Sequence, residues 1–360
     1  MRFGRLTSRT AIGLDIGSRH VKAVQLERAH GEFPWRLAAG ACFPRPAAAV
    51  PIQADELRTI ASVLDRRGFR GNRVIVPVPA EKLIGGVLDV PSRTAAVPIE
   101  QIARMELART SRCAPDSFEM GFWDLPSSSR ANRKPQVMAV GCAHQEADAV
   151  IDSFSAGGLD VVALDVRSSA LVRAAAPLCG GDQSLFAILD LGWGSAMMVL
   201  TFAGSVVFTR TLPDAGTRTL HESLRSRLGL DADVVDYFLN EPGVVAAGPS
   251  HPENDLPTEA RNLLTAYVDS LVQELKVSVS YLTQEYPDAP LSGLLLSGSN
   301  AGLPHLSGYM KNALGLEARV VAPSQFVECP PTLLESAGSP ALMAAVGLAQ
   351  FKAEDPSCGT

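Results

Sequence analysis

The sequence predicts an α/β protein made of two duplicated lobes, with a small α+β subdomain inserted into the first. The main observation is a pattern that occurs twice, as IGLDIGS at residues 12–18 and as ILDLGWGS at residues 188–195. In each copy an apolar strand carries one aspartate, Asp15 or Asp190, followed by glycine and a small hydroxyl residue. The same order of elements follows each copy, and two such units in one chain indicate an internal duplication.

Each unit reads as three strands followed by a helix. After Asp15 the expected elements are His20–Glu27, Trp35–Phe43 and the helix Asp55–Arg67, with a turn at 30–31. After Asp190 the matching elements are Ser195–Phe202, Val206–Leu212 and the helix Thr217–Leu228, with a turn at 203–205. Glycine marks both turns.

Additional elements lie between the two units. A strand bounded by prolines is expected at Arg73–Pro79, and a strand-helix-strand-strand-helix block follows over about Ala80–Gly157. The elements of the block are Lys82–Val90, Ile99–Ser111, Phe118–Leu125, Gln136–Cys142 and Gln145–Ala156, with a polar loop at 126–135. The strand Asp160–Val166 and the helix Arg167–Leu178 then return the chain to the first lobe.

The second half continues after a loop at Glu241–Pro257 that is rich in proline, glycine and small residues. The expected elements are the helix Thr258–Glu285, the strand Leu291–Ser297, a helix ending near Leu314, the strand Arg319–Ala322 and the helix Pro340–Lys352. Proline suits the first turn of that last helix. The expected domains are a first lobe (10–79 and 158–183), an insert (80–157), a second lobe (184–352, with a helical subdomain at 217–288) and a tail (353–360).

The bulk composition excludes several classes of protein. The 360 residues are 46% hydrophobic and 19% charged, with a net charge of −6, which is ordinary for a globular protein. No basic stripe with interleaved aromatic residues occurs, so nucleic acid is not an expected partner. The six cysteines are scattered without a C-x-x-C pair, and we interpret them as reduced thiols of a cytosolic protein.

No membrane segment is expected. Residues 1–10 carry three arginines but no apolar run, and the apolar stretch Leu185–Phe208 is interrupted by Asp190 and three glycines. A β-hairpin is therefore the better interpretation of that stretch. The tail 353–360 is not amphipathic and offers no anchor. A link to a membrane would need a partner protein.

The repeated aspartates predict a metal-polyphosphate site. Strand side chains alternate between faces, so Asp15 points with Gly13 and Gly17, away from the apolar side chains between them. A lone carboxylate at a glycine-lined strand end is placed to hold a hydrated cation, and glycines let backbone N–H groups approach an anion. We expect Asp15 and Asp190 to face each other and to hold Mg²⁺ through water.

Four segments are candidates to bind one nucleotide. The two repeated loops would hold the phosphates, a loop entering a helix N-terminus suits an anion or a sugar edge, and a polar helix face would bracket the ribose and base. The candidate residues are Asp15, Gly17, Ser18, Lys22, Asp190, Gly192, Gly194, Ser195, Glu274, Lys276, Ser278, Gly298, Ser299 and Asn300. A solvated helix face and an ordinary strand-loop-helix remain the alternatives for the last two segments. No P-loop or dinucleotide fingerprint occurs.

In this order, the motifs resemble PilM-type type IV pilus assembly proteins of the actin/Hsp70 (FtsA-like) ATPase superfamily. IGLDIGSRHVKAVQL and ILDLGWGS resemble the two phosphate loops, and ELKVSVSYL resembles the adenosine-side helix. LLLSGSNAGLPHLSGYM resembles the adenosine loop, and PALMAAVGLA the closing helix. The resemblance covers roughly residues 10–352 and implies an actin-like (ribonuclease H-like) fold whose insert is the subdomain shared with the division protein FtsA.

The resemblance also implies a function. It indicates a cytoplasmic protein that binds ATP with Mg²⁺ and lies at the inner membrane through a partner. That partner is the cytoplasmic N-terminal peptide of a bitopic membrane protein, PilN in the family, and its groove lies between the first lobe and the insert. Met105 and Leu107 on the helix Ile99–Ser111 are candidates for the groove, with plain core packing as the alternative.

Several residues depart from the family pattern, and they change the expectation that ATP is hydrolysed. Hydrolases of the superfamily carry Gln or Glu near the start of the helix after Asp165 to position water, whereas this chain has Arg167. Because phosphoryl transfer depends on positioning the attacking water, we expect slow or absent turnover. Trp193, Val277 and Ser299 are further departures. A nucleotide-free pseudo-ATPase of a type II secretion-like system, an FtsA-like division protein and a sugar kinase are the competing hypotheses, and self-association stays open.

Overall fold

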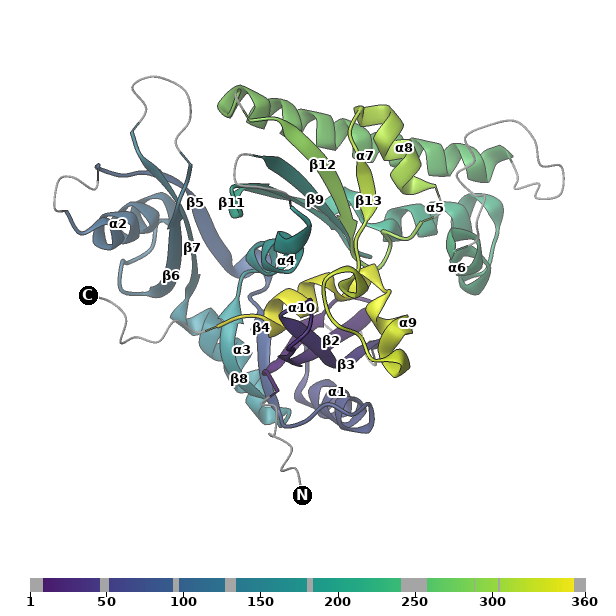
Figure 1. Ribbon diagram of the computed structural model, residues 1–360, viewed down its shortest axis with the longest axis horizontal. Helices are drawn as coiled ribbons and strands as arrows, with labels where there is room; N and C mark the ends of the chain where they lie inside the picture. Colours follow the sequence, from purple (N-terminus) through teal and green to yellow (C-terminus); the bar gives the residue numbers. More distant parts are fainter. Residues whose placement is uncertain are drawn as a thin grey trace.

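The structure of the chain is a computed structural model with two five-stranded sheets and one three-stranded sheet (Figure 1). It describes residues 9–45, 52–92, 97–126, 134–179, 184–240, 258–287, 289–303 and 305–352. The predicted loop at 241–257, the tail 353–360 and most of the loop at 126–135 lie outside these residues.

The first lobe is the sheet ordered β3-β2-β1-β4-β8. Its strands are β1 (Ile12–Ile16), β2 (His20–Arg28), β3 (Trp35–Pro44), β4 (Arg73–Pro77) and β8 (Asp160–Asp165). β1 and β2 pair antiparallel, whereas β1 and β4 pair parallel. The helix α1 (Ala54–Arg66) covers the face that bears Ile12 and Leu14.

The second lobe repeats this topology in the sheet ordered β11-β10-β9-β12-β13. Its strands are β9 (Leu185–Leu191), β10 (Ala196–Phe202), β11 (Ser205–Leu212), β12 (Leu291–Ser297) and β13 (Ala318–Val320). β9 pairs antiparallel with β10 and parallel with β12, as β1 does with β2 and β4. The predicted duplication is therefore confirmed in strand order and direction.

Helices cover one face of the second sheet. The long helix α7 (Thr258–Glu285) packs on it together with α5 (Thr217–Leu228) and α8 (Leu306–Leu314). The helix α6 (Ala232–Asn240), which the sequence analysis did not predict, packs against α5. Near the C-terminus lie α9 (Leu334–Ala337) and α10 (Met343–Ala349), the latter shorter than predicted because its first turn, Pro340–Leu342, is a 3₁₀-helix.

The insert contains the sheet ordered β5-β7-β6, covered by α2 (Ile99–Ser111). Its strands are β5 (Leu83–Asp89), β6 (Phe118–Asp124) and β7 (Gln136–Ala143). The helix α3 (His144–Ala156), which we assigned to the insert, contributes Phe154 to the first-lobe core. By packing, α3 therefore belongs with the first lobe.

Two helices form a layer between the five-stranded sheets, α4 (Arg167–Ala175) and α10 (Figure 1). Their side chains share one apolar cluster with residues of both sheets. The layer is tight because glycine lies at its crossings. A Cβ atom on Gly347 would lie 1.8 Å from the carbonyl oxygen of Ala170, and one on Gly13 would lie 2.1 Å from that of Ala345. This layer sets how the two lobes meet.

Among the described residues, no single helix combines the length and apolarity of a membrane span. The pair Pro331–Ala337 and Pro340–Ala349 meets those criteria only when joined across an 80° bend.

Candidate functional site

Asp15 and Asp190 occupy matching places in the two lobes. Each lies near the end of the central strand of its sheet, on β1 and β9, and the side chains are only 3% and 4% exposed. Leu189 and Leu191, the neighbours of Asp190, pack in the cluster that contains α7. Because strand side chains alternate, Asp190 points to the opposite face, toward α4. Asp15 likewise shares a face with Gly13, which contacts α10.

Arg167, the first residue of α4, bridges the two carboxylates. Its Nη2 and Nε donate to Asp190 Oδ2 at 2.7 and 3.0 Å. Its Nη1 donates to Asp15 Oδ1. The same guanidinium thus binds one carboxylate from each lobe.

Further partners complete the charge balance of the cluster. Lys22 Nζ lies 3.3 Å from Asp15 Oδ2, and the Ser297 hydroxyl donates to Asp190 Oδ1 at 3.1 Å. Burial raises the pKa of Asp15, but the positive charges of Arg167 and Lys22 outweigh it and lower that pKa to about 2. Both acids raise the pKa of Arg167 against the opposing effect of its burial. Two carboxylates therefore face two cations, and the cluster is formally neutral.

The two repeated loops contact each other across the lobes. The Gly17 N–H donates to His20 O at 2.9 Å, and the Gly192 N–H donates to Ser195 O at 3.1 Å, so each loop is closed on itself. A Cβ atom on Gly194 would lie 3.4 Å from the Ser18 hydroxyl of the other lobe. The prediction that these loops face each other agrees with this geometry, whereas their role in phosphate binding stays a prediction.

The loop after β12 joins the same cluster. Gly298 has a φ of +94°, and a Cβ atom there would lie 2.8 Å from Asp190 Oδ1. The Asn300 N–H donates to Leu191 O at 3.2 Å, while its side-chain Nδ2 is buried without a hydrogen-bond partner among the described residues. Ser299, between them, is partly exposed.

The candidate residues on α7 do not join the cluster. Glu274 forms an ion pair of 2.8 Å with Arg210 on β11, and Arg210 also donates to the Ser278 hydroxyl at 3.4 Å. Arg210 lies opposite Met198, which packs in the α7-side cluster, so both contacts are on the face away from Asp190. Lys276 is exposed. Their proposed contact with the ribose and base stays a prediction that this arrangement does not support.

A second interlobe contact, which the sequence analysis missed, lies beside the loops. Arg19, in the turn after Asp15, forms two hydrogen bonds to Asp236 on α6. The Arg19 guanidinium stacks 4.2 Å from the centre of the Trp193 ring, and His221 Nε2 lies 3.2 Å from Asp236. Trp193, bulky for such a loop, is thereby packed between the lobes.

A family model described as type IV pilus assembly protein PilM matches residues 13–352. The chain belongs to the PilM family. A solved structure named as a PilM-PilN type IV pilus biogenesis complex superposes with a TM-score of 0.75 at 22% identity, over 94% of this chain and 97% of that one.

Two further structures show the actin-like fold more widely. The ethanolamine utilization protein EutJ from Carboxydothermus hydrogenoformans has a TM-score of 0.54 at 15% identity, covering 97% of this chain and 92% of its own. MreB5 of Spiroplasma citri, in a structure with ADP bound, has a TM-score of 0.52 at 10% identity, covering 93% and 94%. The predicted actin-like class is therefore confirmed for this PilM-family chain.

The residues do not fit a divalent metal ion in the arrangement described. Mg²⁺ binds through carboxylate oxygens and waters in octahedral geometry, and here Arg167 already occupies both carboxylates. Within the described ranges, no group of three His, Cys, Asp or Glu side chains is placed to bind a metal. The Mg²⁺ site at Asp15 and Asp190 stays a prediction, and it requires Arg167 to move.

The PilM-family chain also has a groove of about 890 Å³ between β6 of the insert and the first lobe. Its lining is rich in aromatic and cationic side chains: Trp35, Phe122, Trp123, Phe326, Phe351, Arg28, Arg173 and Lys352. Arg28 stacks on Trp35 at 4.2 Å, and Arg173 on Phe351 at 5.3 Å.

The helix that the sequence favoured does not line this groove. Leu107 of α2 is buried in the insert core, and Met105 is 66% exposed elsewhere. Trp35 and Trp123, both partly buried, were the signal available in the sequence, because tryptophan is enriched at binding interfaces.

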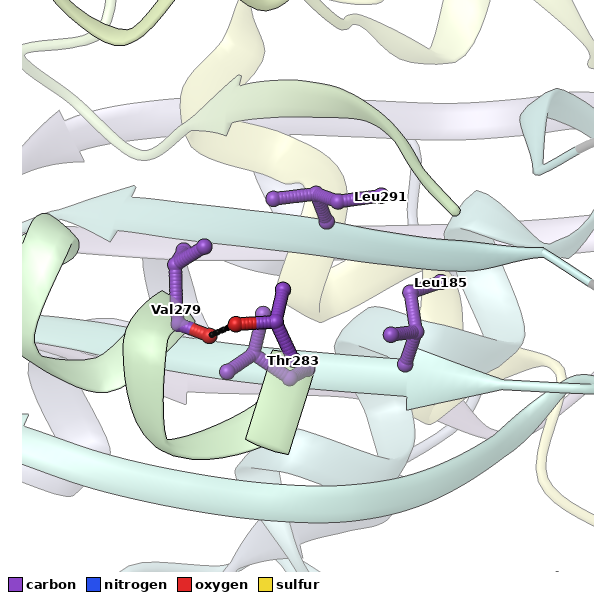
Figure 2. A pocket seen from close by; sticks show the side chains of 5 residues that line it. Leu185, Val279, Thr283 and Leu291 are labelled. Atoms are coloured by element: carbon purple, nitrogen blue, oxygen red, sulfur yellow. Dashed lines mark hydrogen bonds between the residues drawn. The ribbon is translucent and has the colours of Figure 1, made fainter. Parts of the chain in front are cut away.

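A recess under the C-terminal half of α7 differs from this groove in being small and mainly apolar (Figure 2). Leu185, Leu291 and Val279 line it, and the Thr283 hydroxyl donates to Val279 O at 3.2 Å. It is too narrow to admit a water molecule. We therefore assign it to core packing.

Proposed function

We propose that this PilM-family protein is an actin-like scaffold of type IV pilus assembly that holds the cytoplasmic N-terminal segment of a bitopic, PilN-like inner-membrane protein. The observation that carries the proposal is the groove between β6 and the first lobe. β6 is an edge strand of the three-stranded sheet, and the groove lies alongside it. The related structure named as a PilM-PilN complex supports this kind of partner. The protein would then lie on the cytoplasmic side of the inner membrane through that partner.

The groove suits an extended peptide. An edge strand offers backbone N–H and C=O groups for strand addition, and aromatic pockets beside it can select side chains. The Trp123 indole N–H is already used, since it donates to Val206 O on β11 at 2.8 Å. That hydrogen bond ties β6 to the second lobe, so a peptide in the groove would contact a strand whose position both lobes determine.

Gly121 allows a direct test of the groove. It is exposed on β6, lines the groove, and has nothing within 4 Å of the position that a Cβ atom would take. We expect Gly121→Tyr to weaken binding of the synthetic partner peptide roughly tenfold or more, because the ring fills the groove; each tenfold loss is about 1.4 kcal/mol. The measurement is fluorescence anisotropy of the labelled peptide.

Gly86→Tyr is the matched control. Gly86 lies on β5, the other edge strand of the same sheet, and it also has nothing within 4 Å of a Cβ position. This variant should bind the peptide as the wild type does. Equal affinity of all three proteins would place the peptide elsewhere.

We also propose that a nucleotide such as ATP binds between the repeated loops. The support is the actin-like fold, whose MreB5 representatives have solved structures with ADP and AMPPNP, and the facing loops around Gly194 and Ser18. Lys22 and Arg167 offset the charges of Asp15 and Asp190 there, so the site has no net negative charge to repel a polyphosphate. Hydrolysis should be slow or absent, because Arg167 holds the position at which a water-positioning acid or amide was expected.

Gly194→Val tests this second proposal. The added side chain would extend toward Ser18, which already lies 3.4 Å from a Cβ position at Gly194. We expect ATP affinity, measured by equilibrium dialysis, to fall at least roughly tenfold, with Gly86→Val as the control. If neither the wild type nor the control binds ATP, the pseudo-ATPase hypothesis holds instead.

A further inference from the structure

The contacts of Arg167 support an inference that goes beyond the proposed binding of peptide and ATP. Arg167 follows β8 and begins α4, the helix that lies between the two sheets. A cation at a helix N-terminus is unfavourable with respect to the helix dipole. This position is stabilised instead by three hydrogen bonds to Asp15 and Asp190. The Arg167 side chain is therefore stabilised by the two carboxylates and not by the dipole of its own helix.

The geometry matches a guanidinium better than a metal ion. A planar guanidinium presents several N–H donors in fixed directions and can bind carboxylates on two sides. Asp190 Oδ2 accepts hydrogen bonds from two of these donors, and Asp15 Oδ1 accepts one from the third. Of the remaining carboxylate oxygens, Asp190 Oδ1 accepts from Ser297, and Asp15 Oδ2 lies against Lys22. Three of the four oxygens therefore accept hydrogen bonds, whereas buried Asp15 Oδ2 has the Lys22 ion pair but no hydrogen-bond partner among the described residues.

The charge balance of the site also favours a guanidinium over a divalent metal ion. A dication is attracted to a site by uncompensated carboxylates, and this site has none, because Arg167 and Lys22 balance the two acids. Binding Mg²⁺ here would place further positive charge beside buried Lys22 and partly exposed Arg167. Arg167 would first have to leave both acids.

A second contact also joins the two lobes. Arg19 of the first lobe contacts both Trp193 and Asp236 of the second. This contact involves neither carboxylate of the central cluster. Two separate sets of side chains therefore join the same edges of the lobes.

We infer that Arg167 is the resident cation of the interlobe site, replacing a divalent metal ion and holding the two lobes closed on Asp15 and Asp190 in the absence of nucleotide. The inference concerns the nucleotide-free protein, so it stands apart from the proposals on peptide and ATP.

Manganese binding tests the inference directly. Mn²⁺ serves as a paramagnetic probe for a Mg²⁺ site, and its free fraction is measured by electron paramagnetic resonance on nucleotide-free protein. We expect no binding to this site in the wild type. Arg167→Met should bind Mn²⁺ roughly tenfold more tightly or better, because Asp15 and Asp190 lose the guanidinium that they share and only Lys22 remains beside them. The double variant Arg167→Met/Asp190→Asn should lose that gain.

Two controls separate this role from a merely structural one. Arg173→Met removes another arginine of α4, whose partner is Asp165 at 2.9 Å, and should gain no Mn²⁺ site. Small-angle scattering should show an increased radius of gyration for Arg167→Met without metal and a return toward the wild-type value with Mn²⁺.

The wild type alone can overturn the inference, even if Arg167→Met does not fold. Its thermal unfolding midpoint should be the same in millimolar Mg²⁺ and in chelator. A rise with Mg²⁺ that Asp15→Asn abolishes, or Mn²⁺ binding by the wild type that Asp190→Asn abolishes, would show that the acids hold a metal and that Arg167 does not replace it.

Discussion

Gly347→Ala is expected to destabilise the protein by about 3 kcal/mol or more, at the upper end of what overpacking costs. The new methyl carbon would lie 1.8 Å from the carbonyl oxygen of Ala170 and 2.4 Å from its carbonyl carbon. These are backbone atoms of α4, so no side-chain rotation relieves the clash, and α10 must move away from α4. The free energy of unfolding by urea measures the loss.

Gly308→Ala is the matched control for this substitution. Gly308 lies within α8 and has nothing within 4 Å of a Cβ position. Because alanine is the better helix former by about 1 kcal/mol, this variant should be as stable as the wild type or slightly more stable. A Gly347→Ala protein with wild-type stability would mean that α4 and α10 do not cross as closely as described.

Acid pH should remove about 2 kcal/mol of stability through Asp15 alone. Its pKa is about 2 in the folded chain, compared with an ordinary value of 3.8. The unfolded state therefore takes up the proton first as the pH falls. The contribution of Asp15 is complete above about pH 4 and is lost progressively as the pH falls through about 2.

Asp15→Asn isolates this contribution. Urea unfolding at a series of pH values should show the variant less stable than the wild type at pH 7, with the difference shrinking between about pH 4 and 2. Asp116→Asn, at an exposed position, should follow the wild-type curve. A constant difference between Asp15→Asn and the wild type at every pH would show that the Asp15 charge contributes no stability.

Most elements of the fold could be predicted because local pattern determines them. α2, α5, α7 and β12 have the predicted bounds, since each carries a continuous apolar pattern between clear boundaries. α6 was missed because it is only nine residues long and follows α5 after a short turn. α3 was predicted as a helix of the insert, whereas its Phe154 packs in the first-lobe core, a contact that the local sequence pattern does not determine.

The site was predictable only in part. The repeated Asp-x-Gly pattern placed Asp15 and Asp190 in matching positions, and the topology brings both toward α4. Glu274 and Ser278 were assigned to the site because they share a helix face, but that face lies against Arg210 on the other side of the sheet. Spacing along a helix determines which residues share a face, and it does not determine what that face contacts.

The sequence by itself therefore determined the duplicated lobes, the insert, the PilM-family membership and the two aspartates, because strand periodicity and repeated motifs are local properties. Only the tertiary structure decided what neutralises those aspartates and where the groove lies. Arg167 is 152 residues from Asp15 in the chain and 23 from Asp190. The groove joins β6 with residues of β2, β3 and α4 and with residues 350–352 near the C-terminus. Such contacts depend on how α4 and α10 pack between the two sheets. Close packing at the glycine crossings decides that arrangement, and no single sequence motif determines it.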